Sequence, residues 1–350
     1  MDQLITGIQQ VGIGVKNIEE AKYLYRDLFG MNVLVFNDEA DATLMTRYTG
    51  GEMHRRKALL SLNMQGGGGF ELWQFVSREP SGPQLEPQFG DIGILASKIK
   101  TTNINIAYTS FSKESSVSVS PILTSSSNQK YFWLKDIYGN NFNVVEHKSL
   151  FKKSKASCGG VTGAVIGVTD MDKAIHFYKN VLGIQNIVYD ITETENYFDK
   201  QNTNRKYRRV LLTKDAATQG AFSKLLGCVE IELVEAKSHI PSVIYQDRYW
   251  GDCGFIHLCF DVNDMNGLKQ KAAAAGFIFT VDSHDSFSME AAAGRFCYME
   301  DPDKTLIELV ETHKVPVFKK MGIYFDLKKR KTNKPLSDWM VSLLGLSKIK

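Results

Sequence analysis

The sequence predicts an α+β protein made of four strand–helix–strand–strand–strand units arranged as two halves. Three observations support this prediction. The segment GIQQVGIGVKNIEEAKYLYRDLFGM, which begins at Gly7, recurs without a gap as GVTGAVIGVTDMDKAIHFYKNVLGI from Gly160. A fainter repeat relates the segments that begin at residues 89 and 255. A short basic stretch rich in Ser and Gly, residues 152–160, has the composition of a linker between the halves.

The first and third units, near residues 5–76 and 160–236, each open with a strand of alternating apolar residues and continue into a helix. In the third unit the apolar residues recur at helical spacing: Ala174, Phe177, Tyr178, Val181 and Leu182. Asp170 or Asp172 can cap the start of this helix, and Gly183 can close it. The β-rich segments FELWQFV at 70 and CVEIELVEA at 228 then predict the remaining strands.

The second and fourth units, near residues 89–147 and 252–311, match in pattern more than in identity. The stretch YFWLKDIYGNNFNVVEH at 131 aligns with RFCYMEDPDKTLIELVET at 295, so that Asp136 falls on Asp301. The helix expected in the second unit, TTNINIAYTSFS, is a poor helix former. We therefore divide the chain into residues 1–150, residues 157–313 and a C-terminal extension, 314–350.

Composition excludes several classes of protein. The net charge of +3 over 350 residues gives no basic field for nucleic acid. No signal peptide and no apolar run long enough to span a bilayer is present. The five cysteines show no C-x-x-C spacing, which favours a reducing, cytoplasmic setting. The GGGG run at 66–69 lacks the Lys and Ser/Thr of a phosphate loop and joins two strand-like runs, so we expect a flexible turn there.

The repeated unit, its opening pattern and the closing sequence IELVE resemble the vicinal-oxygen-chelate superfamily, which includes glyoxalase I, bleomycin-resistance proteins and extradiol dioxygenases. The resemblance covers about residues 5–311. It implies that the four units pair into two glyoxalase-like domains with cupped mixed sheets. It also implies a metal inside a cup, held by residues on the first and last strands of the paired units.

In the C-terminal half, three polar residues stand between apolar neighbours at those positions: Glu232, His257 and Glu308. Buried carboxylates need a cation or protons. A divalent metal supplies the cation, and Zn, Fe, Mn, Ni or Co are all suited to these donors. Gly163 occupies the fourth position and cannot ligate, which leaves room for water or substrate. Dioxygenases of the superfamily need a histidine there, so its absence favours a lyase or isomerase.

The N-terminal half offers Gln10, Glu71, Asp91 and Asn143 at the same four positions. Gln10 and Glu71 match the first two ligands of the glyoxalase pattern, while Asp91 and Asn143 replace the expected His and Glu. We interpret this set as a hydrogen-bonded polar cluster in a half that no longer catalyses. A weak site for a hard metal is the alternative.

Three residues are candidates for proton transfer. Glu232 is a candidate base that leaves the metal, His284 a candidate shuttle on a loop bordering the cup, and Tyr298 a candidate acid or oxyanion donor. The expected function is a metal-dependent lyase or isomerase acting on a small molecule with neighbouring oxygens. The alternatives are a non-catalytic small-molecule binding protein of the same fold and a ring-cleaving dioxygenase with an altered iron site.

The extension from Lys314 carries ten Lys and Arg residues against two Asp, and LSDWMVSLLGL within it predicts a short helix with one apolar face. We expect it to dock on its own domain or on a second subunit. Peripheral contact with an anionic membrane is the alternative. The sequence leaves open whether the protein is a monomer or a homodimer.

Overall fold

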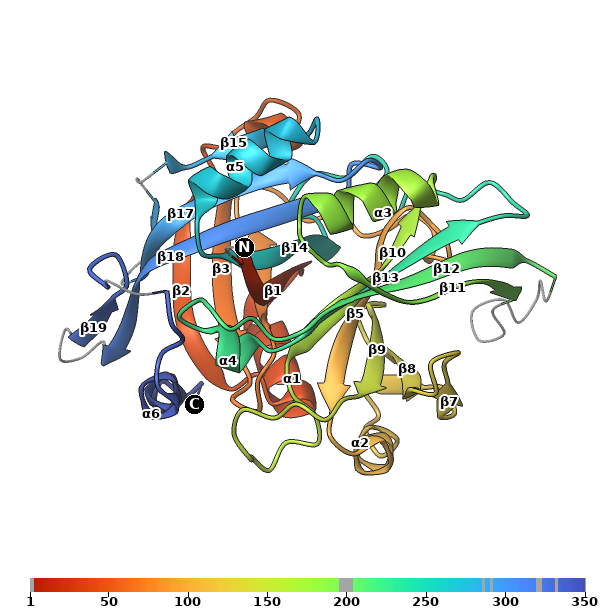
Figure 1. Cartoon of the computed structure of the whole chain (residues 1–350), viewed down its shortest axis with the longest axis horizontal. Coiled ribbons are helices and arrows are strands. Elements are labelled where there is room, and N and C mark those ends of the chain that lie inside the picture. The colour runs from red at the N-terminus through yellow and green to blue at the C-terminus, as the bar shows by residue number, and fades with distance from the viewer. Residues whose placement is uncertain are drawn as a thin grey trace.

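Two mixed β-sheets, each built by strands from two of the four repeated units, form the framework of the protein (Figure 1). The computed structural model describes residues 3–194, 204–284, 287–289, 292–318, 323–330 and 333–349. The predicted α+β class and the two mixed sheets are confirmed.

The first sheet joins the first unit to the fourth, in the order β15-β17-β18-β14-β1-β4-β3-β2. Its strands are β1 (Ile5–Gly14), β2 (Val33–Asp41), β3 (Arg55–Leu62), β4 (Gly69–Phe75), β14 (Gly254–Val262), β15 (Phe279–Asp282), β17 (Ala292–Glu300) and β18 (Leu306–Phe318). Two short strands, β16 (Phe287–Met289) and β19 (Ile323–Asp326), pair with β17 and β18.

The second sheet joins the third unit to the second, in the order β11-β12-β13-β10-β5-β9-β8-β6. Its strands are β5 (Gly93–Thr101), β6 (Val117–Val119), β8 (Lys130–Asp136), β9 (Asn141–Glu146), β10 (Val161–Val168), β11 (Asn186–Thr194), β12 (Lys206–Lys214) and β13 (Val229–Ala236). The two-residue strand β7 (Leu123–Thr124) pairs with β8.

The sheets therefore do not follow the predicted division into residues 1–150 and 157–313. β1 pairs along its length with β14 in antiparallel register, so that Gly12 lies opposite His257. Units from opposite halves share each sheet because the opening strand of one unit hydrogen-bonds to the opening strand of its partner unit. This crossed pairing decides which side chains meet in each cup.

The helices follow the capping signals of the sequence. The side chain of Asn17 caps α1 (Ile18–Phe29), which ends at Gly30 in the left-handed conformation with φ of 63°. Asp170, one of the two predicted caps, caps α3 (Met171–Asn180). Asn103 caps α2 (Ile104–Phe111), so the segment predicted as a poor helix former does form a helix. The described residues also form α4 (Ser223–Leu226), α5 (Met265–Ala274), α6 (Asp338–Ser342) and the 3₁₀ turns η1 (Thr46–Tyr48) and η4 (Leu343–Leu346).

A buried Tyr–Asp hydrogen bond recurs at the two symmetry-related places where a helix meets a strand end. The hydroxyl of Tyr25 on α1 donates to Asp136 at 2.7 Å, and that of Tyr178 on α3 donates to Asp301 at 3.0 Å. All four residues are buried. These bonds give the repeated Tyr and Asp of the sequence a structural role, because each links a helix of one unit to the strand of another.

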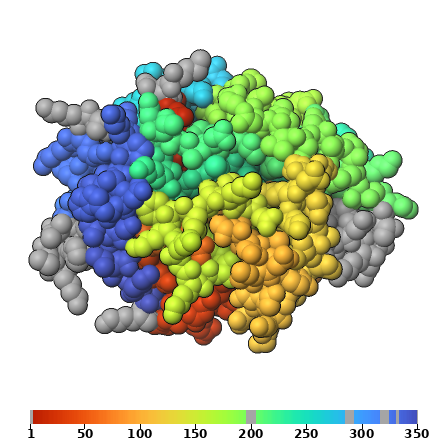
Figure 2. Space-filling view, turned by 60° about the horizontal axis from the view of Figure 1, so that its bottom comes forward, coloured from red at the N-terminus to blue at the C-terminus, as the bar shows by residue number. Residues whose placement is uncertain are grey.

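The C-terminal extension docks on its own chain. The backbone N–H of Leu34 donates to Ser347, that of Ile349 donates to Asn32, and that of Leu336 donates to Ala221. Figure 2 shows this segment, in dark blue, lying against the chain near residue 220. None of the helices in the described part of the chain has the length and apolar character needed to cross a bilayer.

Candidate metal centre

Four polar side chains converge in the middle of the first sheet, each from a different strand. Gln10 comes from β1, Glu71 from β4, His257 from β14 and Glu308 from β18. All are at most 5% exposed. The strand registers explain their meeting, because Gly12 lies beside both Glu71 and His257, and Cys259 lies beside Glu308.

Gly12 is the residue that lets the imidazole enter this group. A Cβ atom at position 12 would collide with the ring of His257. Glycine is therefore required at this position of β1, since any larger residue would displace the imidazole of His257 from the centre of the sheet.

The polar atoms of the group lie close together. The Nε2 atom of His257 is 3.0 Å from Glu308 Oε2 and 3.2 Å from Glu71 Oε2. The Nε2 atom of Gln10 donates to Glu71 Oε2 at 3.1 Å and to Glu308 Oε2 at 3.2 Å. One ligand atom from each of Glu71, His257 and Glu308 lies within 4.8 Å of the other two.

The electrostatics of the group are those of buried acids that share one positive charge. Burial alone would lower the pKa of His257, but the carboxylates of Glu308 and Glu71 raise it to about 9. Burial and the charge of Glu308 raise the pKa of Glu71. In the absence of another cation, a proton on the imidazole supplies the positive charge that the two acids need.

The donor set fits a divalent metal. Two carboxylates, an imidazole and an amide oxygen are ligands that Zn, Ni, Co, Mn and Fe accept. Neither Gln10 Oε1 nor His257 Nε2, both buried, has a partner with hydrogen-bond geometry among the described residues. Polar atoms left this way inside a protein carry a desolvation cost, which a shared cation would offset.

Glu232, the expected third ligand, lies in the other sheet and belongs to a different cluster. Its carboxylate accepts a hydrogen bond from Arg209 Nε at 2.9 Å and lies 3.3 Å from Lys98 Nζ. Burial opposes ionisation of Glu232, but Arg209 and Lys98 hold the pKa of its carboxyl at about 2. The ligand assignment is therefore corrected: crossed pairing of the units puts Glu71 with His257, and Glu232 is neutralised by two side-chain cations.

The other predicted positions also fall in the second sheet. The side chain of Asp91 accepts hydrogen bonds from the backbone of Gln88 and Ser242, each at 2.8 Å, and so orders the chain before β5. Asn143 lies beside Lys98 across β5 and β9. A Cβ atom at Gly163 would collide with the backbone of Glu230. The second sheet thus holds the carboxylate of Glu232 beside two side-chain cations, Arg209 and Lys98.

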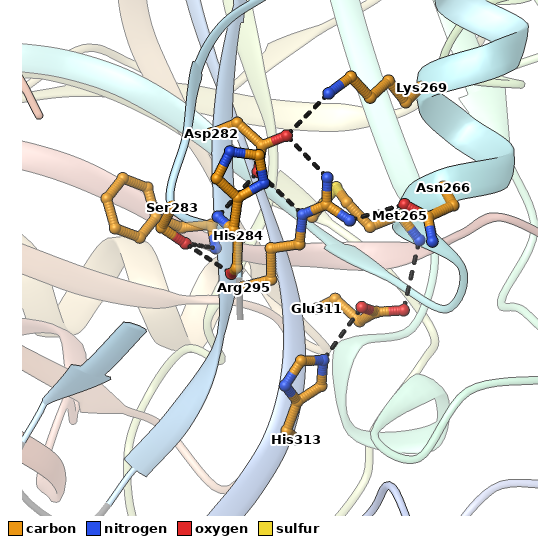
Figure 3. Close-up of polar contacts among 10 residues, drawn as sticks. Met265, Asn266, Lys269, Asp282, Ser283, His284, Arg295, Glu311 and His313 are labelled. Atoms are coloured by element: carbon orange, nitrogen blue, oxygen red, sulfur yellow. Dashed lines mark hydrogen bonds and ion pairs between the residues drawn. The ribbon is translucent and has the colours of Figure 1, made fainter. Parts of the chain in front are cut away.

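The two remaining candidates differ in their positions. The hydroxyl of Tyr298 on β17 lies 3.3 Å from His257 Nδ1 and is buried at the site. Figure 3 shows His284 beside Asp282, in a network with Arg295 and Lys269. The side chain of His284 is 78% exposed, and its contacts are with this network. The structure therefore does not bring it to the group around His257.

The fold is similar to that of several solved structures. A candidate dioxygenase from Bacillus subtilis superposes with a TM-score of 0.57 at 12% identity, over 89% of this chain and 86% of that chain. Glyoxalase I from Zea mays superposes with a TM-score of 0.51 at 12% identity, over 87% of this chain and 92% of that chain. A mutant of the same maize enzyme gives a TM-score of 0.55 at 10% identity, over 87% and 93% of the two chains.

Sequence comparison gives a consistent result. No curated protein sequence matches the chain significantly. Residues 164–299 match the family model described as the glyoxalase/bleomycin resistance protein/dioxygenase superfamily. The matched region, residues 164–299, is therefore similar to this superfamily, and it lies in a chain with two sheets built from four repeated units and a buried Glu–His–Glu group at the centre of one of them.

Proposed function

We propose that the protein is a metal-dependent lyase or isomerase that moves a proton on a small substrate with neighbouring oxygens. The observation that carries the proposal is the meeting of Gln10, Glu71, His257 and Glu308 in one buried group. In the resemblance drawn from the sequence, these are the residue types of the glyoxalase pattern in their order along the paired units.

The group opens into a cavity of about 430 Å³. Glu71, Glu308 and Gln10 all line this cavity, so a substrate can reach the ligand atoms. Its volume is in the range of cavities that hold small molecules.

The residues present would hold a divalent ion through Glu71, His257 and Glu308, with the amide of Gln10 beside the two carboxylates. When bound, such an ion supplies Lewis acidity toward a substrate oxygen and favours loss of a proton from the neighbouring carbon. The carboxylate of Glu71 or Glu308 would accept that proton and return it. Tyr298, next to His257 Nδ1, holds the orientation of the imidazole.

The composition of the group favours proton transfer over ring cleavage. A non-haem iron dioxygenase uses two histidines and one carboxylate. The cluster of potential metal ligands in the described part of the chain instead contains one histidine and two carboxylates.

Two measurements on metal-loaded protein test the proposal. The first is deuterium incorporation from D₂O into α-hydroxyketones and hemithioacetals, followed by NMR. The second is oxygen uptake with catechols. We expect metal-dependent exchange and no oxygen uptake. Oxygen uptake would replace the proposal with a dioxygenase, and protein that binds no metal would support a non-catalytic binding role.

A further inference from the structure

The cavity beside the metal-ligand group has walls that are mainly apolar. β3 contributes Leu60 and Leu62, and the short helix α4 contributes Leu225 and Leu226. Trp73 and Trp250 lie edge to face, with ring centroids 4.5 Å apart, and also line it. A substrate body in this space would contact hydrocarbon and indole surfaces on several sides.

The charged side chains that line the cavity are nearly all acidic. They are Asp38, Asp41, Glu71, Asp261 and Glu308, with Arg56 as the one base among the described lining residues. The guanidinium of Arg56 is already used, because it lies 2.7 Å from Asp38 and also stacks over Trp73. Although the Nε atom of Arg56 has no hydrogen-bond partner, no cationic side chain without an acidic partner lines the described part of the cavity.

Asp261 adds a further acid beyond the metal-ligand group; burial raises the pKa of its carboxyl to about 6, so it is mostly ionised at neutral pH. It is 5% exposed, and its described partners are the hydroxyl of Thr6 and the amide of Gln9. Neither partner is charged, so an anion entering the cavity would meet an acid without a compensating base.

We infer that this cavity selects a substrate with an apolar body that is neutral or cationic, and that it excludes anionic molecules such as charged peptide adducts. This inference rests on the proposed function for the reaction, but the charge and shape of the cavity carry it. A divalent ion would offset the charges of Glu71 and Glu308, while Asp261 would stay uncompensated.

The C-terminal extension supplies part of the cavity wall, and so contributes to substrate specificity. Leu344, in η4, is 6% exposed and lines the cavity together with Val315. The backbone bonds from Leu34 to Ser347 and from Ile349 to Asn32 fix this segment against β2. Leu344 is thus a specificity-determining residue contributed from outside the repeated units.

Two fluorescent probes of nearly equal shape test the inference on the full-length, metal-loaded protein. N-phenyl-1-naphthylamine is neutral, and 1-anilinonaphthalene-8-sulfonate adds one negative charge to the same skeleton. We expect the neutral probe to bind at least about tenfold more tightly, because charge repulsion acts across a water-poor cavity. Equal or tighter binding of the sulfonate, or binding of neither probe, would overturn the inference.

Two variants locate the binding. Leu344→Trp fills the cavity and should weaken binding of the neutral probe about tenfold or more, whereas Leu346→Trp, at a residue 56% exposed, should leave it unchanged. If Leu344→Trp does not fold, Asp261→Asn provides an independent test, since it should reduce the ratio of the affinities for the neutral and the sulfonated probe. An unchanged preference in Asp261→Asn would contradict the electrostatic argument. Probe binding needs no turnover, so its failure is distinguishable from loss of metal-dependent exchange.

Discussion

The side-chain amide of Gln10 lies 3.2 Å from the carboxylate of Glu308, which joins the opening strand of the chain to its last long strand. The same amide lies 3.1 Å from Glu71. These contacts bring Gln10, from the start of the sequence, next to the other polar residues of the group. The proposed metal centre is therefore formed by the first and fourth units together.

The identity of the metal ligands is tested by three amide substitutions of glutamate. Glu71→Gln and Glu308→Gln should each weaken metal binding at least about tenfold, because each removes an anionic ligand. Glu232→Gln should leave the metal content unchanged, since Glu232 lies with Arg209 and Lys98. Metal content per chain, measured by mass spectrometry after loading and dialysis, distinguishes these outcomes. Loss of metal in Glu232→Gln alone would restore the ligand set expected from the C-terminal half.

Tyr298→Phe should weaken metal affinity about 10–100-fold while leaving one metal per chain at saturation. The hydroxyl lies 3.3 Å from His257 Nδ1 and holds the ring that offers Nε2 to the centre. Competition with a chelating dye measures the affinity. Tyr48→Phe is the matched control, because the Tyr48 hydroxyl contacts Thr280 and Glu300 instead. Equal losses in both variants would contradict a specific role for Tyr298.

Glu232→Gln should lower the free energy of unfolding by about 3–5 kcal/mol near neutral pH, because it leaves Arg209 and Lys98 with less compensation in a buried cluster. The pKa of Glu232 is held at about 2, below its usual 4.5. The stabilisation from ionised Glu232 is therefore fully present above about pH 4.5 and is lost as the pH falls through 2. Urea denaturation of both proteins at pH 7 and pH 3.5 checks the sign, since the difference between them should shrink in acid.

Asp301 should make the protein less stable as the pH rises from 4 to 7. Burial raises the pKa of Asp301 from 3.8 to about 7, so the folded state holds a proton that the unfolded state has released. Its contribution is complete below pH 3.8 and falls by at most about 1.4 kcal/mol for each pH unit until the folded pKa is passed. Asp301→Asn should flatten this slope in denaturation curves at pH 5, 6 and 7. An unchanged slope would assign the dependence to other groups.

Neither half of the chain should bind metal when it is produced alone. A cut within residues 152–160 separates Gln10 and Glu71 from His257 and Glu308. Co-production of both halves should restore binding, which shows that a missing partner, and not damage at the cut, caused the loss. A C-terminal half that binds one metal by itself would refute the crossed pairing.

Local sequence patterns predict the modules, the helix caps and four polar residues that meet at the metal centre. Gln10, Glu71, His257 and Glu308 each stand out as a polar residue at a particular strand position. Their predicted grouping is wrong because the choice of partner strand depends on contacts between distant units. No local pattern in the sequence determines whether β1 pairs with β5 or with β14.

Register is the source of a second error. The faint repeat aligns Asp91 with His257. In the structure, Lys98 pairs with Asn143 across β5 and β9, and Cys259 pairs with Glu308 across β14 and β18, so Lys98 is structurally equivalent to Cys259. Ala96 is therefore the counterpart of His257. Alternating apolar residues fit several registers equally well, so the faint repeat alone could not select the correct one. Lys98 and Arg209, which neutralise Glu232, carry no motif in the sequence.

The order in which the chain leaves the ribosome has a chemical consequence. The second sheet uses one continuous stretch of sequence, whereas β1 and β4 must wait until β14 and β18 have been made. Until then Gln10 and Glu71 have no imidazole beside them. Loading of the proposed metal would thus be confined to nearly finished molecules, and a truncated product that stops before residue 306 would lack part of the ligand group.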